Sequence, residues 1–169
     1  MLVKESSQTD VVRHVNVDEK QLESVKSPLL REAYALWNGK RGTRRMASRS
    51  DFDPMEMPRL LSSIILVDVK DGGARLKVRL SGTKVVEMYG RDFTGMYMDE
   101  IDFGDVREKI LEEYNLPVSE KRPVFSNHEF RKLNDYHHTI ERAIFPLSND
   151  DQTVDKLIAF LDFERVLKI

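Results

Sequence analysis

The sequence of 169 residues contains no cysteine. Disulfides, thiolate zinc sites, cysteine nucleophiles and iron–sulfur clusters held by cysteine are therefore excluded. The absence is typical of proteins in a reducing, intracellular compartment, and we expect a cytoplasmic protein.

The chain also has little net charge and no long apolar run. Its 27 Lys and Arg residues nearly balance 29 Asp and Glu residues, which gives a formal net charge of −2. Dedicated DNA-binding domains are usually strongly basic, so we expect no nucleic acid as a partner. No run approaches the roughly 18 apolar residues that span a bilayer, and the N-terminus lacks the apolar core of a secretory signal. We therefore expect no membrane association.

Familiar catalytic signatures are missing too. The sequence has no nucleophile elbow, no phosphate-binding loop and no dinucleotide fingerprint, and "SGTK" at 81–84 lacks the first glycine of a phosphate loop. Glu112 and Glu113 are adjacent on a predicted helix, so they point in different directions and we interpret them as part of a solvated face. We predict that the protein is not an enzyme.

The residues that are present predict one folded domain with an N-terminal arm. Forty per cent of the chain is hydrophobic, including eight Phe, five Tyr and one Trp, which is enough for a core. Residues 1–26 are polar and poorly periodic, so we interpret them as a mobile arm. Residues 27–169 form the domain, and helix start signals at Ser27-Pro28 and Asp53-Pro54 predict a helical cap over 27–62.

The periodicity after this cap indicates an α+β fold. Alternating segments predict strands at 64–69 and 74–80, joined by a hairpin turn, and three more at 124–133, 137–147 and 156–166. Between the two groups of strands lie short helical turns and a longer helix that begins after Asp105 and ends or kinks at Pro117. Strands on either side of a helical block favour an antiparallel sheet covered by helices.

Five segments in this order resemble a PAS-type family of small bacterial proteins, associated mostly with alphaproteobacteria. They are "W…KRGTRRMASRSDFDP", "LLSSIILVDV", "RLSGTKVVEMYGRDFTG", "EYNLPVSEKRPV" and "ERAIFPLSND", which together cover residues 29–165. The chain departs from the family at Ala47, where the family usually has Pro, and in the short interval between Gly90 and Gly95. The resemblance implies a PAS-like antiparallel five-stranded sheet with helices on one face and N-terminal flanking helices.

The resemblance also implies a non-enzymatic sensory or signalling module that binds an unidentified small ligand, a signalling partner protein, or both. A chromophore attached through cysteine is excluded, and we do not expect haem or flavin, although a flavin held without a covalent bond stays open. Two alternatives remain. One is a ligand-free interaction adaptor whose cavity is filled by side chains such as Phe125, Phe145 and Phe160, and the other is an uncharacterised enzyme.

Polar residues that interrupt apolar rows are the candidate ligand-binding residues, because a buried polar group needs a partner. They are Tyr114 on the longer helix, His128 on the third strand and Arg142 on the fourth. Alternatively, His128 and Arg142 face solvent or pair with neighbouring glutamates. His137 and Glu141 share a strand face but lack a third ligand, so we predict no metal site.

Two further surfaces are candidates. Arg41, Arg44 and Arg45 lie in a basic stretch that could bind an anion, although we favour a connector whose arginines pair with nearby carboxylates. The helix at 28–38 carries Leu30, Tyr34 and Trp37 on one face, and the resemblance implies a homodimer or partner interface there. The chain's own sheet could cover the same face instead.

Overall fold

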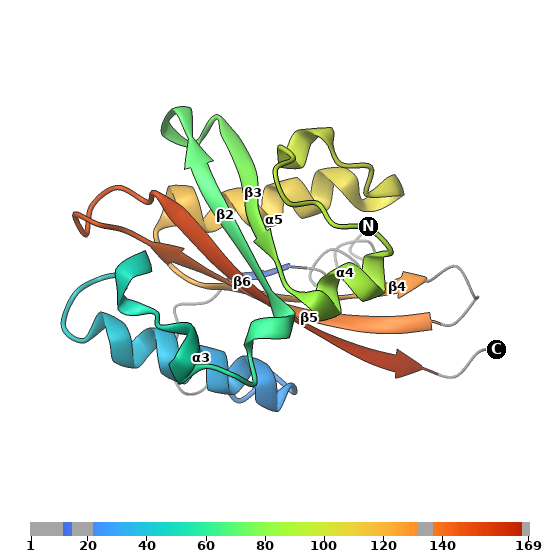
Figure 1. Cartoon of the computed structure of the whole chain (residues 1–169), viewed down its shortest axis with the longest axis horizontal. Coiled ribbons are helices and arrows are strands. Elements are labelled where there is room, and N and C mark those ends of the chain that lie inside the picture. The colour runs from blue at the N-terminus through green and yellow to red at the C-terminus, as the bar shows by residue number, and fades with distance from the viewer. Residues whose placement is uncertain (1–11, 15–21, 132–136, 167–169) are drawn as a thin grey trace, which may run out of the picture.

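A computed structural model describes residues 12–14, 22–131 and 137–166 (Figure 1). Its centre is a five-stranded antiparallel sheet, and a short strand, β1, pairs with the outer edge of β4. The predicted α+β fold is confirmed. In sheet order the strands are β1 (Val12–His14), β4 (Val124–Arg131), β5 (His137–Leu147), β6 (Lys156–Val166), β2 (Ile64–Lys70) and β3 (Arg75–Ser81).

Among the residues that the structure describes, three helices of more than one turn pack against the two faces of this sheet. Helix α3 (Pro28–Arg41) covers the face that carries Phe125 and Phe145, which we call the outer face. Helices α4 (Thr83–Tyr89) and α5 (Arg107–Glu120) lie against the opposite, inner face (Figure 1). None of the helices in the described part of the chain is long and apolar enough to cross a membrane.

The start signal at Asp53-Pro54 does not open an α-helix in the predicted cap, which was expected to extend to residue 62. The structure has two 3₁₀ turns there, η2 (Pro54–Glu56) and η3 (Leu61–Ser63). Pro58 explains the break, because its ring disfavours the helical conformation at Met57, which has φ −136° and ψ 47°. By contrast, α5 runs through Pro117 to Glu120 instead of ending at the proline.

Part of the segment predicted to be a mobile arm belongs to the packed structure. Strand β1 pairs with β4, and Val25 is buried in the core. The amide of Lys26 donates a hydrogen bond to Glu141, 3.0 Å away. Packing therefore begins before residue 27, because an apolar side chain at position 25 reaches the core; residues 1–11 and 15–21 lie outside the described residues.

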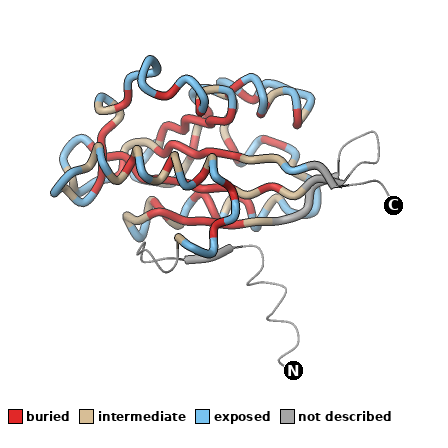
Figure 2. Tube along the Cα trace, turned by 90° about the horizontal axis from the view of Figure 1, so that it is seen from below, coloured by how far each residue is buried: buried red, intermediate tan, exposed pale blue. Residues whose placement is uncertain are grey.

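Helix α3 buries its apolar face against the chain's own sheet. Trp37 stacks on Phe145 at a ring distance of 5.5 Å, and its indole N–H donates to the carbonyl oxygen of Pro146 at 3.0 Å. Leu30 is 1% exposed and Trp37 is 3% exposed, whereas Tyr34 is half-buried. Leu30 and Trp37 therefore cannot form the expected partner surface while α3 packs on the sheet, because the outer face of the sheet already covers them. Figure 2 shows the resulting buried layers.

The basic connector that follows α3 is stabilised by hydrogen bonds and an ion pair of its own arginines. Arg41 donates from Nε to the amide oxygen of Asn38 at 2.8 Å, and Arg44 pairs with Asp51 at 2.6 Å. Arg45 is exposed. Two of the three guanidinium groups therefore have partners within the loop, which favours the connector interpretation over an anion site.

Gly82, at the start of α4, is a position where the fold leaves no room for a side chain. A β-carbon there would lie 2.6 Å from the carbonyl oxygen of Leu61, and closer still to that of Ser62. These are backbone atoms, so the clash cannot be relieved by a rotamer change. In α3, Gly39 has nothing within 4 Å of the same position.

We expect Gly82→Ala to lower the free energy of unfolding by about 1–3 kcal/mol, the usual cost of forcing extra atoms into a packed site. The matched control, Gly39→Ala, should raise it by about 0.5–1 kcal/mol, because alanine loses less backbone entropy in a helix. Urea denaturation followed by circular dichroism measures both. Equal effects from the two substitutions would contradict the close approach of α4 to η3.

Candidate functional site

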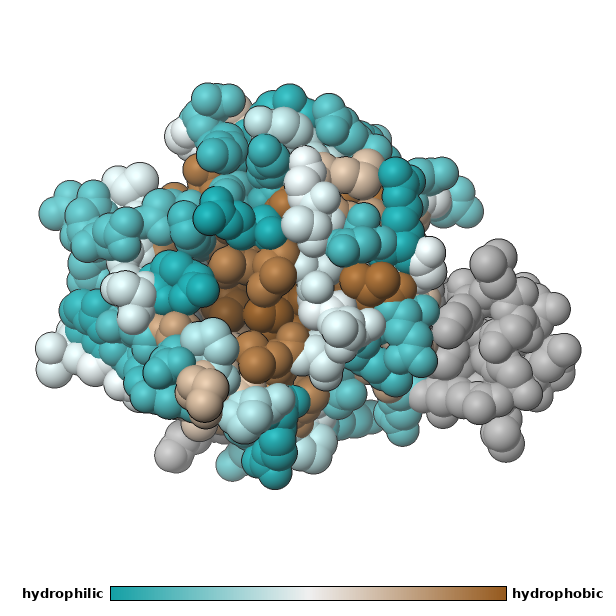
Figure 3. Space-filling view, viewed as in Figure 1, coloured by the Kyte–Doolittle hydropathy of each residue, from teal (hydrophilic) through white to brown (hydrophobic). Residues whose placement is uncertain are grey.

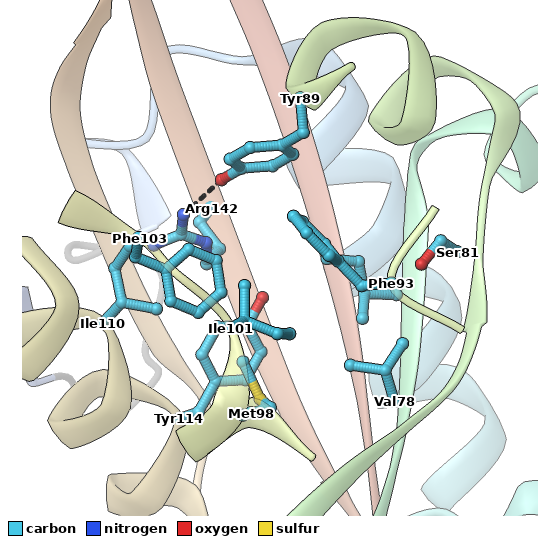
Figure 4. A pocket seen from close by; sticks show the side chains of 11 residues that line it. Val78, Ser81, Tyr89, Phe93, Met98, Ile101, Phe103, Ile110, Tyr114 and Arg142 are labelled. Carbon is cyan, nitrogen blue, oxygen red and sulfur yellow. Dashed lines mark hydrogen bonds between the residues drawn. The ribbon is translucent and has the colours of Figure 1, made fainter. Parts of the chain in front are cut away.

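A small cavity lies between the inner face of the sheet and the helical layer (Figure 4). Its volume is about 10 Å³, which is room for about one water molecule. Most of its walls are apolar, and the polar groups come from β3, α4, α5 and β5. The lining residues are Ile65, Val78, Ser81, Tyr89, Phe93, Met98, Ile101, Phe103, Ile110, Tyr114 and Arg142.

Three aromatic rings form one wall of the cavity. Tyr89 lies 5.6 Å from Phe93 and 6.4 Å from Phe103, and the two phenylalanines are 5.9 Å apart. All three pairs are steeply inclined, the arrangement in which the positive edge of one ring meets the negative face of another. The end of α4 and the segment after it therefore contribute a wall suited to apolar or aromatic contact.

A buried ion pair lies next to this aromatic wall (Figure 4). Arg142 on β5 donates to the carboxylate of Glu113 on α5 at 2.7 Å, and their side chains are 1% and 0% exposed. The hydroxyl of Ser126 on β4 donates to the same carboxylate oxygen. Arg142 also donates to the hydroxyl of Tyr89 at 3.4 Å. The guanidinium group of Arg142 on β5 thus connects α4 and α5, and the carboxylate of Glu113 extends the cluster to β4.

Burial and the neighbouring carboxylate have opposite effects on the pKa of Arg142. Burial alone would lower the pKa of Arg142, but the adjacent carboxylate of Glu113 more than compensates, so the pKa is raised and the guanidinium stays charged. Burial also raises the pKa of Tyr114, which therefore keeps its hydroxyl proton at neutral pH. The result is a neutral ion pair beside a protonated phenol.

Several buried polar atoms in this region lack a hydrogen bond of ordinary geometry to any residue that the structure describes. They include the hydroxyl of Tyr114, Nε of Arg142, the hydroxyl of Ser81 and the second carboxylate oxygen of Glu113. Leaving such a group unpaired costs about 1–3 kcal/mol. Three of these four residues line the cavity, so a water or a polar ligand would find partners there.

Two of the three residues predicted to bind a ligand meet at this cavity. Tyr114 and Arg142 both line it. His128 is in β4, opposite Ile140, and its side chain lies outside the described residues. The alternative, in which Arg142 faces solvent or pairs with Glu141, is wrong, because Arg142 is buried and pairs with Glu113.

Glu113 and Tyr89 were missed from the sequence. The interpretation of Glu113 as part of a solvated face is wrong, because its side chain is completely buried. The spacing held a signal: Glu113 is three residues after Ile110 and four before Pro117, which places it on the apolar face of α5. Tyr89 gave no comparable signal, because it ends a short helix.

The aromatic residues proposed to fill the cavity lie on the other side of the sheet. Phe125, Phe145 and Phe160 pack together under α3, with neighbouring rings 5.8–5.9 Å apart. In β5, Arg142 and Ala143 are consecutive, so they point to opposite faces, and Phe125 is paired with Ala143. These phenylalanines therefore belong to the outer core and leave the cavity to other side chains.

The outer face also has a shallow apolar groove beside the connector. Its volume is about 60 Å³, and it lies near the centre of the hydrophobic area in Figure 3. Leu80, on the edge strand β3, is 46% exposed there. The groove is lined mainly by Phe52, Met57, Leu61, Ile64, Leu66 and Leu80.

No group of three or more histidine, aspartate or glutamate side chains stands close enough to hold a metal ion among residues 22–127 and 139–164. The charged cluster at the cavity contains one carboxylate, that of Glu113, and its arginine partner is a cation. The arrangement can bind and orient a small polar group by hydrogen bonds.

Known structures with a similar fold include light-oxygen-voltage proteins. One, described as a light-oxygen-voltage domain studied with a flavin analogue, has 8% sequence identity and a TM-score of 0.51, and the alignment covers 67% of this chain and 83% of that one. Another, the LOV protein of Rhodobacter sphaeroides, has 13% identity and a TM-score of 0.49, with 66% and 68% covered. At such identities, the likeness concerns the fold alone. No curated protein matches the sequence.

A family model provides the stronger comparison. The model described as PAS domain matches residues 25–162, nearly the same range as the five segments quoted above. Its start at residue 25 agrees with the burial of Val25. The sheet order, the helical layer over the inner face and the small cavity fit the same assignment. The resemblance is thus confirmed, and this chain belongs to the PAS domain family.

Proposed function

We propose that the protein is a sensory signalling module that binds a small ligand in the cavity between the sheet and helices α4 and α5. The observation that carries this proposal is the set of unpaired polar atoms of Tyr114, Arg142 and Ser81 at an otherwise apolar cavity. Buried polar atoms without partners are rare in folded proteins. Membership of the PAS family supports a sensory role and argues against catalysis.

Binding would have to enlarge the cavity, which holds about one water molecule. Arg142 is bonded to Glu113 on α5 and to Tyr89 on α4, so a ligand at the guanidinium group acts on both helices. A ligand that binds the enlarged form better shifts the population toward it. Strand β5 carries Arg142 on one face and Ala143 on the other, which gives the change a route toward α3 and a partner protein.

A flavin would need a much greater enlargement of the cavity than a small ligand would. A cavity of about 10 Å³ is far smaller than a tricyclic ring system, and the chain has no cysteine for a covalent adduct. The flavin analogue belongs to the light-oxygen-voltage relative. We therefore propose a smaller ligand; haem and flavin are still not expected, while a flavin held without a covalent bond stays open. A homodimer in the cytoplasm also remains a proposal, but its interface would not include Leu30 and Trp37 while α3 covers them.

A ligand-free adaptor is the second candidate, and the small volume of the cavity favours it. In that case one ordered water would satisfy the hydroxyl of Tyr114 and Nε of Arg142, and signalling would depend only on surfaces. Native mass spectrometry of the protein purified from its own host separates the two functions. A reproducible excess mass supports a bound ligand, whereas a clean apo mass supports the adaptor.

Tyr114→Phe tests whether the unpaired hydroxyl serves the ligand. In the empty protein we expect the free energy of unfolding to rise by about 1 kcal/mol, because an unsatisfied buried hydroxyl is removed. The excess mass in the native spectrum should fall at the same time. A loss of stability of more than about 1 kcal/mol would show instead that the hydroxyl has a structural partner such as water.

A further inference from the structure

We infer that the ligand is a small uncharged molecule that presents a hydrogen-bond acceptor, and that anions are rejected. This inference rests on the proposed function, because it concerns the occupant of the same cavity. Two observations support this inference: the charges at the site cancel, and the unpaired polar groups that line the cavity are hydrogen-bond donors.

The charge balance comes from the ion pair. Arg142 is the one charged residue among those described that line the cavity, and Glu113 neutralises it at 2.7 Å. An anionic ligand would lie beside the carboxylate of Glu113 in a region of low dielectric, where like charges repel strongly. If the anion displaced Glu113, it would leave a completely buried carboxylate without its cation, which is equally unfavourable.

The free hydrogen bonds point to an acceptor. Each terminal nitrogen of Arg142 uses one of its two N–H bonds for Glu113 or Tyr89, Nε has no partner among the described residues, and every guanidinium N–H can only donate. The hydroxyl of Tyr114 stays protonated and can donate as well. In Figure 4 both side chains lie on the same side of the cavity, opposite Val78.

The apolar part of the cavity wall indicates what the rest of the ligand should look like. Tyr89, Phe93 and Phe103 offer ring edges and faces, and Ile110 adds an aliphatic surface. These groups favour an apolar or aromatic body attached to the acceptor. Together the features describe a small amide, ketone or alcohol.

Two matched pairs of probes test the inference: benzamide with benzoate, and acetamide with acetate. In each pair the shapes are nearly the same, but the amide is neutral and has an NH2 donor in place of one carboxylate oxygen. Binding to the full chain at pH 7 is followed by chemical-shift changes of backbone amides. We expect at least one amide to bind about 10-fold or more tightly than its carboxylate, and Tyr114→Phe to weaken it about 10-fold, the effect of one good hydrogen bond.

The outcomes separate this inference from the proposed function. A carboxylate that binds as tightly as its amide, and that is also weakened by Tyr114→Phe, overturns the uncharged class but leaves the cavity as the ligand site. No binding of any probe overturns both. Glu113→Gln should shift the preference toward the carboxylate, because Arg142 then lacks its counter-charge; if this variant does not fold, the comparison in the wild-type protein decides.

Discussion

Glu113→Ala should lower the free energy of unfolding by about 3–5 kcal/mol, because it leaves the guanidinium group of Arg142 buried without its carboxylate. The pair is separated by 2.7 Å, and neither side chain is appreciably exposed. Ser126 would lose its acceptor in the same substitution. For a domain with a typical stability of about 5–15 kcal/mol, this is a large part of the total. Urea denaturation followed by circular dichroism measures it.

The neighbouring residue provides a matched control. Glu112 is exposed on the same helix, so Glu112→Ala should change stability by no more than about 0.5 kcal/mol. A double variant, Glu113→Leu with Arg142→Met, should recover most of the loss, since buried ion pairs can often be replaced by apolar side chains of similar volume. If Glu113→Ala were as mild as Glu112→Ala, the buried pair would not exist in solution.

Trp37→Ala is the second substitution with a large expected effect, a loss of about 3–5 kcal/mol from the cavity left beneath α3. The indole ring stacks on Phe145 and is almost fully buried. Trp37→Phe keeps an aromatic ring but removes the hydrogen bond to the carbonyl of Pro146, and should cost about 1–2 kcal/mol. The same denaturation experiment ranks the two variants.

Met55 supplies the control for Trp37, because its side chain is 85% exposed. Met55→Ala should leave stability within about 0.5 kcal/mol of the wild type. A Trp37→Ala variant with unchanged stability would mean that α3 does not rest on its own sheet in solution. The original expectation of a partner surface at Leu30 and Trp37 would then return.

The sequence predicted the sheet well because strand alternation is a strong local signal. Leu76, Val78 and Leu80 alternate with charged residues, and the predicted strand at 74–80 is observed at Arg75–Ser81. The helix that begins after Ser27 was equally clear, since Ser27 caps it and Pro28 suits its first turn. No α-helix forms after Asp53, although Asp53 caps the first turn, because Pro58 disfavours the helical conformation at Met57.

The site was only half predictable, and the reason is geometrical. Period-two alternation separates Arg142 from Ala143, but it cannot tell which face of a strand turns toward the cavity. That choice depends on where α3 and α5 pack, which is a long-range property. The phenylalanines were assigned to the wrong face for this reason, whereas Tyr114 and Arg142 were found because polar residues in apolar rows need partners. Glu113 could have been found by the same argument applied to α5.

The position of Trp37 gives the protein an optical reporter of its own. It is the one tryptophan in the chain, and it lies against the sheet on the face opposite the cavity. Its emission wavelength and quenching by iodide therefore follow the seating of α3 without a label. A compound bound in the cavity is separated from the indole by the thickness of the sheet. A change in Trp37 emission on binding would therefore show that a structural change on the inner face is transmitted to the outer face.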